Sequence, residues 1–98
     1  SFEIFEKQSS LETIGDYALG ECSNLICISI PSSVTKIKQY AFKGCRSLKK
    51  VLFDDQSSLN TIEKYAFNEC SALISIEIPP SVINIGFKAF DGCLLFHI

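Results

Sequence analysis

The sequence predicts an α/β solenoid of about four units, each with a short parallel strand and a short helical turn. The first observation behind this prediction is that isoleucines recur at intervals of 23, 25 and 23 residues, at Ile14, Ile37, Ile62 and Ile85. The second is that other residue types keep the same intervals, namely Ala18, Ala41, Ala66 and Ala89, and Cys22, Cys45, Cys70 and Cys93. So many columns in register indicate one structural unit of 23–25 residues repeated along the chain.

Each unit combines two hydrophobic periodicities. One stretch ends in an apolar pair two residues apart, Val51 and Phe53, which predicts a short strand with one buried face. In another stretch Ile37, Ala41 and Cys45 lie four residues apart, which predicts one or two helical turns. The strand and the helical turn therefore alternate along the chain.

The units differ by two residues in their connections. Residues 6–11 and 54–59 are longer connections than residues 31–34 and 79–82, and their extra residues are polar, so we expect them to lie in solvent. A single unit buries too little apolar surface to fold alone, and successive units must therefore stack and share a core. The prediction is one domain over residues 1–98, with units at 11–33, 34–58 and 59–81 and partial units at 1–10 and 82–98.

Residues 30–48 carry a more specific pattern, with Ile-Pro-Ser-Ser-Val at the start, Ala41-Phe42 and Cys45 in the middle and Leu48 at the end. This pattern resembles the BspA-like class of leucine-rich repeats, whose units read I-P-x-S-V-x-x-I-x-x-x-A-F-x-x-C-x-x-L-x-x-I-x-I-P. The resemblance implies a right-handed superhelix and a surface-exposed protein of host-associated bacteria or protists that adheres to host proteins or cells. The incomplete first and last units predict a segment of a longer protein.

The composition argues against several classes of protein. No apolar run approaches the ~18 residues of a membrane span. The net charge of −2 is unlike the basic charge of most nucleic-acid-binding domains. The single histidine, His97, has no nucleophile or orienting group near it in the repeat, and there is no glycine-rich phosphate loop. We therefore expect no membrane insertion, no nucleic-acid partner, no catalysis and no cofactor.

The five cysteines allow three interpretations. Zinc ligands usually come in pairs two to four residues apart, whereas the repeated cysteines here are 23–25 residues apart, so a metal site is disfavoured. Disulfides between adjacent windings stay open on geometric grounds, but free thiols that fill the core are favoured. Cys27 occupies a strand position equivalent to Lys50 and Ser75, so we expect it to face outward and to be the most reactive thiol.

A run of basic residues follows the first complete unit. Six of the nine Lys and Arg residues lie here, namely Lys36, Lys38, Lys43, Arg46, Lys49 and Lys50. They suggest a site for polyanions such as sulfated glycans. However, the run spans most of one winding, so its charges are expected to form a belt and not to share a face. Pairing with acids of neighbouring windings, such as Glu63 beside Lys38 and Glu69 beside Lys43, is the favoured interpretation.

The favoured binding surface is the outward face of the strand ladder. Side chains between the buried columns point away from the core. They are Cys27, Ser29, Lys50, Leu52, Ser75 and Glu77. Because strands lie ~4.8 Å apart, the ladder of four windings is about 15–20 Å long, which suits a short peptide or a loop of a protein partner. Leu52 is the expected apolar anchor.

Together, the repeat and the resemblance predict a non-catalytic protein-binding or adhesion module. The resemblance places it on the cell surface or among secreted proteins, with host extracellular-matrix or cell-surface proteins as partners. An intracellular scaffold is the alternative, because the cysteines look reduced and the sequence begins without a signal peptide. End-to-end self-association is also expected, since both ends of the solenoid lack a cap and Leu94, Leu95 and Phe96 lie near one of them.

Overall fold

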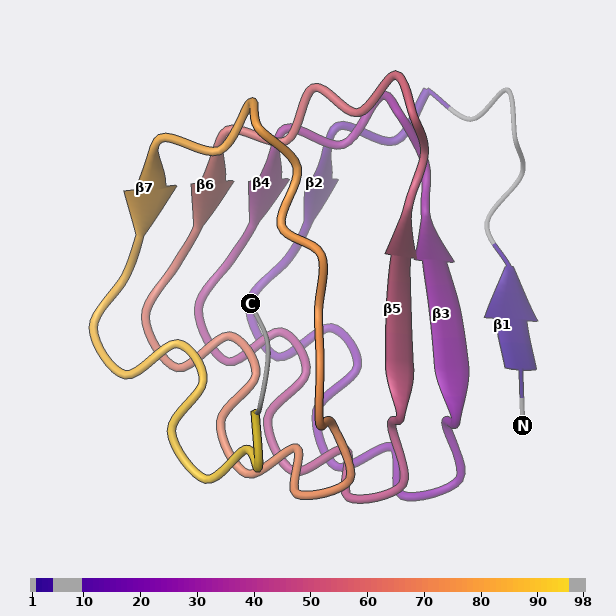
Figure 1. Ribbon diagram of the computed structural model, residues 1–98, viewed down its shortest axis with the longest axis vertical. Helices are drawn as coiled ribbons and strands as arrows, with labels where there is room; N and C mark the ends of the chain where they lie inside the picture. The colour runs from indigo at the N-terminus through magenta and orange to yellow at the C-terminus, as the bar shows by residue number, and fades with distance from the viewer. Residues whose placement is uncertain (1, 5–9, 96–98) are drawn as a thin grey trace.

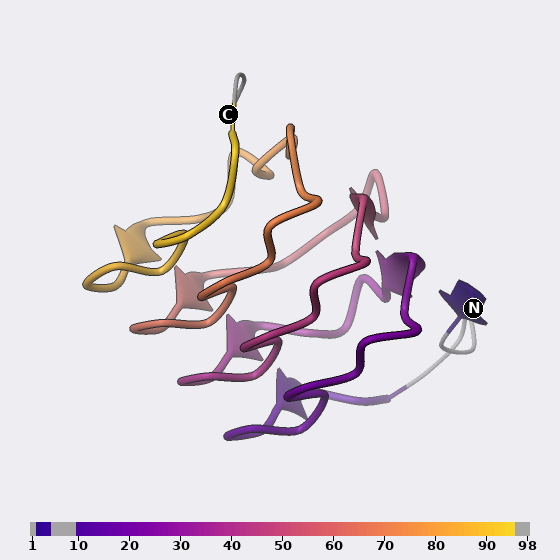
Figure 2. The ribbon, with the colours of Figure 1, turned by 90° about the horizontal axis from the view of Figure 1, so that it is seen from below.

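The computed structural model describes residues 2–4 and 10–95, which form parallel strands in two sheets. A three-stranded sheet has the order β1 (Phe2–Ile4), β3 (Cys27–Ile30), β5 (Lys50–Phe53). A four-stranded sheet has the order β2 (Thr13–Ile14), β4 (Lys36–Ile37), β6 (Thr61–Ile62), β7 (Asn84–Ile85). The sheets lie on two sides of the molecule (Figure 1), and successive windings step from the N-terminal to the C-terminal end (Figure 2).

The register of both sheets pairs equivalent positions of successive units. In the three-stranded sheet Ile28 lies beside Val51, and in the four-stranded sheet Ile37 lies between Ile14 and Ile62. Parallel strands and continuous columns are therefore confirmed. The handedness of the superhelix stays a prediction.

The four-stranded sheet was not expected from the sequence, which predicted one strand in each unit. Its strands are only two residues long, and each of β2, β4 and β6 has one buried isoleucine. A two-residue strand gives no recognisable alternation, so the isoleucine column was assigned to the helical turns. The column instead forms the inner side of a second ladder.

The predicted helical turns are wrong, because the described residues contain no helix. The N–H groups of Ala18 and Gly20 donate to the carbonyls three residues earlier, at 3.1 and 3.0 Å. The N–H groups of the alternate residues Tyr17, Leu19 and Glu21 donate to the next winding, at 2.7–3.2 Å. A helix would direct every N–H to the carbonyl four residues earlier. The four-residue spacing of the apolar side chains thus reflects two successive tight turns.

Left-handed backbone makes this alternation of hydrogen bonds possible. Each turn has one such residue at its start, with φ of 57° at Tyr17, 59° at Tyr40, 57° at Tyr65 and 51° at Lys88. This conformation costs roughly 1–2 kcal/mol for a residue with a Cβ. The tyrosines offset the cost by stacking their rings, with centroids 4.8 Å apart for Tyr17 and Tyr40 and 5.0 Å apart for Tyr40 and Tyr65.

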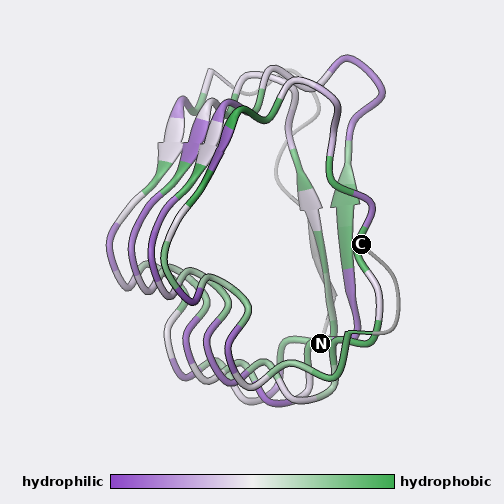
Figure 3. Ribbon diagram, turned by 60° about the vertical axis from the view of Figure 1, so that its left-hand side comes forward, coloured by the Kyte–Doolittle hydropathy of each residue, from purple (hydrophilic) through white to green (hydrophobic). Residues whose placement is uncertain are grey.

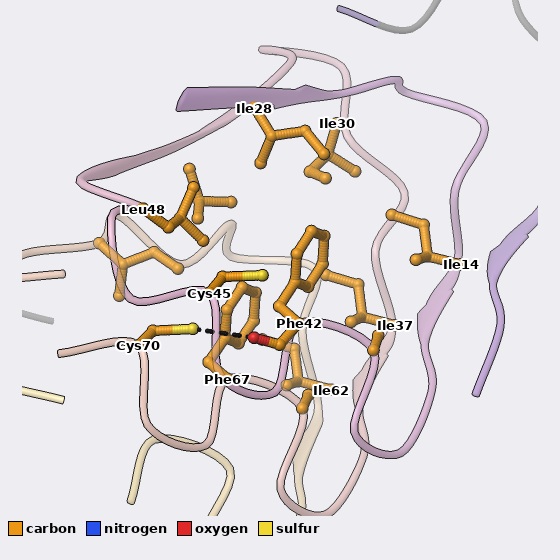
Figure 4. Close-up of a cluster of buried hydrophobic side chains, with 14 of the residues drawn as sticks. Ile14, Ile28, Ile30, Ile37, Phe42, Cys45, Leu48, Ile62, Phe67 and Cys70 are labelled. Atoms are coloured by element: carbon orange, nitrogen blue, oxygen red, sulfur yellow. Dashed lines mark hydrogen bonds between the residues drawn. The ribbon is translucent and has the colours of Figure 1, made fainter. Parts of the chain in front are cut away.

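The core lies between the two sheets and the turns (Figure 4). Its largest fully buried side chains include Phe42 and Phe67, whose rings stack with centroids 4.9 Å apart, and the Ile37 and Ile62 pair beside them. Segments of like hydropathy recur at matching places in successive windings (Figure 3). Stability therefore depends on contact between neighbouring windings.

The serine of the I-P-x-S-V pattern also links adjacent windings. The Ser33 hydroxyl donates to the carbonyl of Leu11, and the Ser81 hydroxyl donates to the carbonyl of Leu59, both at 2.6 Å. Each bond satisfies a carbonyl that lies 22 residues earlier in the sequence. The pattern is therefore explained by polar links between windings as well as by packing.

Candidate functional site

The outer face of β3 and β5, with the segment 75–77 that continues the ladder, carries the predicted binding residues. Along β5, Lys50 and Leu52 are exposed on either side of the buried Val51, and 47% of the Leu52 surface is open to solvent. Ser75 and Glu77 are exposed on either side of the buried Ile76. Four of the six predicted residues therefore lie on an accessible surface, as the alternation of a strand requires.

Cys27 and Ser29 are less accessible than the sequence suggested. Cys27 is only 9% exposed, so the prediction that it is open to solvent is wrong, while its reactivity stays a prediction. The reason is its place on the middle strand, where β1 and β5 flank it on both sides in the register Phe2, Cys27, Lys50. Ser29 is half-buried on the same strand. The accessible part of this face therefore lies over β5 and the segment 75–77.

Two exposed isoleucines beside this face were missed by the sequence analysis. Ile26 and Ile74 precede the strand positions of their windings, and Lys49 occupies the equivalent place between them. All three are exposed, and the N–H of Lys49 donates to the carbonyl of Ile26 at 2.7 Å. A repeat position that holds Ile in some windings and Lys in another does not belong to a buried core. This mixture of residue types could have predicted from the sequence that both isoleucines are exposed. Ile26 and Ile74 therefore add two exposed apolar side chains next to the strand positions that carry this face, where only Leu52 was predicted.

The six basic residues surround the winding, as the sequence predicted. Lys36 belongs to the four-stranded sheet and Lys38 directly follows its strand β4. Lys50 begins strand β5 of the three-stranded sheet on the other side of the molecule (Figure 1), and Lys49 directly precedes it. Lys43 and Arg46 lie in the turns between the sheets. No single face of the described molecule therefore gathers all six charges.

Ion pairs between windings engage the turn residues of this basic run. Glu21 binds Lys43 at 3.6 Å and Arg46 at 3.4 Å, and Arg46 also reaches Glu69 at 3.2 Å. Pairing between windings is therefore confirmed, but Lys43 pairs with Glu21 instead of Glu69. Among the described residues Lys38 makes no ion pair with Glu63. All of these side chains are exposed, so each pair adds roughly 0–1 kcal/mol.

The repeated cysteines donate hydrogen bonds between windings. The thiol of Cys45 donates to the carbonyl of Leu19 at 3.0 Å, that of Cys70 to Phe42 at 3.1 Å (Figure 4) and that of Cys93 to Phe67 at 3.2 Å. These three cysteines and Cys27 are free thiols. The favoured interpretation of the cysteine column, thiols that fill the core, therefore agrees with the geometry.

Cys70 has the most perturbed environment of these thiols. Its side chain is fully buried, with the thiols of Cys45 and Cys93 on either side. Hydrogen bonding with these two thiols, together with burial, raises the pKa of Cys70 well above its ordinary value. Such a thiol stays protonated and is a weak nucleophile, which fits a structural role.

Two features are absent from the described residues, namely a cluster of candidate metal ligands and a helix suited to span a membrane. No group of three or more His, Cys, Asp or Glu side chains among them is placed to hold a metal ion. In the same part of the chain no helix has the length and apolar character needed to cross a bilayer. His97 lies outside the described residues. An open hollow of about 380 Å³ over β6 and β7 is lined by polar and apolar side chains of the sheet, including Thr61 and Asn84.

The fold and surface together define a tandem-repeat protein with parallel strand ladders. The BspA type leucine rich repeat region matches residues 1–98, in six copies, and the chain belongs to this family. Members of leucine-rich repeat families are typically non-catalytic modules that bind proteins, and the BspA-type family is commonly surface-associated in bacteria. No curated protein is similar enough to the chain to be matched.

Three solved structures share the fold. A leucine-rich repeat protein from Bacteroides capillosus is 28% identical with a TM-score of 0.84, and the match covers 97% of this chain and 72% of that one. The Treponema pallidum leucine-rich repeat protein is 26% identical with a TM-score of 0.80, covering 96% and 56%. A Bacteroides ovatus leucine-rich repeat protein is 26% identical with a TM-score of 0.82, covering 99% and 29%. The chain thus spans about half the length of the second relative and under a third of the third.

Proposed function

We propose that the chain is a non-catalytic protein-binding module of a surface-exposed leucine-rich repeat protein, and that it contacts host or matrix proteins through the outer face of the three-stranded sheet. The observation that carries this proposal is the mixed character of that face. Leu52, Ile26 and Ile74 expose apolar surface beside Lys50 and Glu77, although the core already buries most apolar residues of the repeat. Exposed apolar side chains rimmed by charges are typical of protein-binding surfaces.

The size of the molecule sets the strength of such binding. The chain measures 29 × 28 × 24 Å, so one whole face offers about the ~800 Å² that each partner contributes to a standard interface. The ladder itself is smaller than this. We therefore expect weak binding by this segment alone, and firmer binding when several copies or additional windings act together.

Binding of polyanions is a second candidate, supported by the exposed Lys50 on this face and the exposed Lys49 directly before β5. Their side chains take part in no ion pair among the described residues, in contrast to Lys43 and Arg46. An intracellular scaffold role is a third candidate, which would use the same face with a different partner. The proposed protein-binding role accounts for the exposed isoleucines and Leu52, which a polyanion site would not need.

The test measures binding of the purified chain to immobilised extracellular-matrix proteins and, separately, to a heparin surface. Lys50→Glu and Leu52→Glu change the proposed face, and Lys36→Glu is the matched control, because it makes the same charge change on the exposed outer side of β4. We expect the first two variants to bind matrix proteins at least about tenfold more weakly and the control to bind as the unmodified chain does. Unchanged binding of both Lys50→Glu and Leu52→Glu would rule out this face.

The heparin surface separates the two candidates. A polyanion site would be weakened by Lys50→Glu and strongly by salt, but little by Leu52→Glu. Equal losses for Lys36→Glu and Lys50→Glu would indicate a general effect of charge and not a defined face. Far-ultraviolet circular dichroism of each variant confirms that the fold is retained.

A further inference from the structure

The winding that carries β5 has an ordered arrangement of charge around an apolar centre. Two basic residues precede this centre and two acidic residues follow it, namely Lys49, Lys50, Asp54 and Asp55. The arrangement is centred on Leu52, since opposite signs occur two residues before and after it, and again three residues before and after it. The corresponding stretches of the neighbouring windings, 26–32 and 74–80, have Glu77 as their only charged residue. The arrangement therefore belongs to this one winding.

Three residues of this winding form a row on the outer face of the three-stranded sheet. Lys50 and Leu52 are exposed on β5, on either side of the buried Val51. The N–H of Asp54 donates to the carbonyl of Ile30 at 3.4 Å, so the ladder between β3 and β5 extends to Asp54. The alternation of a strand then directs Lys50, Leu52 and Asp54 to the same side, each about 6.6 Å from the next. The row thus presents a basic, an apolar and an acidic side chain in order.

The four charged residues are accessible and form no ion pair in the described part of the chain. Both lysines and Asp55 are exposed, and Asp54 is half-buried. None of the four takes part in an ion pair with a described residue, in contrast to Arg46 of the same winding. Strand β5 lies between β3 and the segment 74–78 (Figures 1 and 2). The row therefore belongs to an inner winding, and its exposure does not depend on an end of the repeat.

We propose that two copies of the chain pair face to face across β5, related by a two-fold axis that lies between the sheets and runs across the strands. This axis reverses one β5 relative to the other and brings Leu52 onto Leu52 of the second copy. Lys50 of each copy then faces Asp54 of the other, and Lys49 faces Asp55. In a symmetric interface each such contact occurs twice, so four pairs of opposite charge surround one apolar contact. Sheets packed face to face lie ~10 Å apart, a distance that extended lysine and aspartate side chains bridge.

Two features limit the strength of this pairing. The same axis brings Glu77 near Glu77 of the second copy, which is one like-charge pair against four pairs of opposite charge. The chain measures 29 × 28 × 24 Å, so one face offers no more than about the ~800 Å² per partner of a standard interface. We therefore expect a weak, reversible dimer that dissociates as the salt concentration rises. Pairing covers Leu52 and Lys50, so it does not need the proposed protein partner and would compete with it for this face.

Sedimentation velocity of the purified chain, at low salt and over a concentration series, tests this pairing in the absence of any partner protein. We expect the unmodified chain to dimerise as its concentration rises. Lys49→Glu and Asp55→Lys each place like charges opposite one another, so each variant should dimerise about tenfold more weakly. An equimolar mixture of the two variants should recover the affinity of the unmodified chain, because the two substituted positions then face each other with opposite charges.

Two comparisons separate the proposed contacts from a general effect of charge. Lys36→Glu makes the same change as Lys49→Glu on the exposed outer side of β4, and it should dimerise as the unmodified chain does. Asp55→Lys removes the net charge of −2, so general repulsion between copies would predict stronger dimerisation of this variant and not weaker. Circular dichroism establishes that each variant is folded. Lys50→Glu and Asp54→Lys form a second pair of the same design, for the contacts nearer the axis.

Three results would overturn this pairing. The first is an unmodified chain that stays monomeric throughout the series at low salt. The second is a mixture of folded Lys49→Glu and Asp55→Lys that dimerises no better than either variant alone, since these positions would then not face each other. The third is an equal loss for Lys36→Glu, which would assign the effect to net charge. None of these results bears on the proposed binding of matrix proteins, because no such protein is present in the measurement.

Discussion

At the scale of single residues, the cysteine column does more than fill space. The Cys70 thiol is fully buried and donates a hydrogen bond to the carbonyl of Phe42 at 3.1 Å. Without this thiol, the Phe42 carbonyl would lose one of its hydrogen-bond donors. Cys27 is also buried, but it lies outside the main hydrophobic cluster. The two thiols therefore form a natural comparison between a core position and a peripheral one.

We expect Cys70→Ala to lower the free energy of unfolding by about 2–3 kcal/mol, because it leaves a small cavity and removes the donor to Phe42. Cys70→Ser keeps a donor and should lose less, and Cys27→Ala should lose less than about 1 kcal/mol. Urea unfolding followed by circular dichroism gives the three values. Equal losses at Cys27 and Cys70 would contradict the assigned role of the column.

The same thiol predicts a dependence of stability on pH. Its neighbours Cys45 and Cys93, together with its burial, raise the pKa of Cys70 in the folded chain. The protonated thiol therefore makes its full contribution to the free energy of unfolding at pH values below its ordinary pKa of 9.0. Above that pH the unfolded chain loses the proton and the folded chain keeps it, so stability falls by about 1.4 kcal/mol per pH unit. The unmodified chain should therefore lose stability faster than Cys70→Ser between about pH 9 and pH 10.5. Parallel curves for the two proteins in urea titrations would refute this linkage.

The sequence predicted the buried residues well and the exposed ones less well. Apolar columns such as Ile37 and Cys45 were recognisable because each winding repeats the same environment. Cys27 was misjudged because strand alternation alone does not reveal that a flanking strand on each side shields a short side chain. Ile26 and Ile74 were missed because each directly precedes a strand position, where the alternation of a strand does not predict whether a side chain is exposed.

At the scale of elements, the turns show why a helical spacing did not produce a helix. The side chains of Ile37, Ala41 and Cys45 do face the core, as a helix of that period would place them. However, the left-handed residues Tyr40 and Gly44 reverse the backbone and send alternate N–H groups to the next winding. Hydrogen bonds to a neighbouring winding depend on stacking, and a local pattern cannot reveal them.

A pair of glycines in one column tests the fit between these elements. Gly15 and Gly86 occupy equivalent places directly after β2 and β7, but a Cβ at Gly15 would meet open space and a Cβ at Gly86 would run into the backbone of Lys64 and Glu63. We expect Gly15→Ala to change the free energy of unfolding by less than about 1 kcal/mol, in either direction, and Gly86→Ala to lower it by about 1–3 kcal/mol. Thermal unfolding of both variants measures the difference. A Gly86→Ala variant as stable as Gly15→Ala would show that β7 moves freely away from β6.

At the scale of the whole molecule, stability is expected to vary with position along the solenoid. Each winding contacts only its neighbours, so an inner winding has two partners and an end winding has one. The exposed Ile85 and the fully buried Ile62 show this difference within one column.

We accordingly predict that the same substitution, Ile to Ala, lowers the free energy of unfolding by different amounts at Ile62 and at Ile85, which occupy equivalent positions. Ile62→Ala should lower the free energy of unfolding by about 2–5 kcal/mol, because it opens a cavity between three windings. Ile85→Ala should lower it by less than about 1 kcal/mol at concentrations where the chain is monomeric, since half of that side chain already faces solvent. Hydrogen exchange gives an independent measure, with the amides of β4 and β6 exchanging more slowly than those of β7. Equal costs at both positions, with uniform exchange along the column, would mean that the chain unfolds as a single cooperative unit in which the end winding is as firmly held as the inner ones.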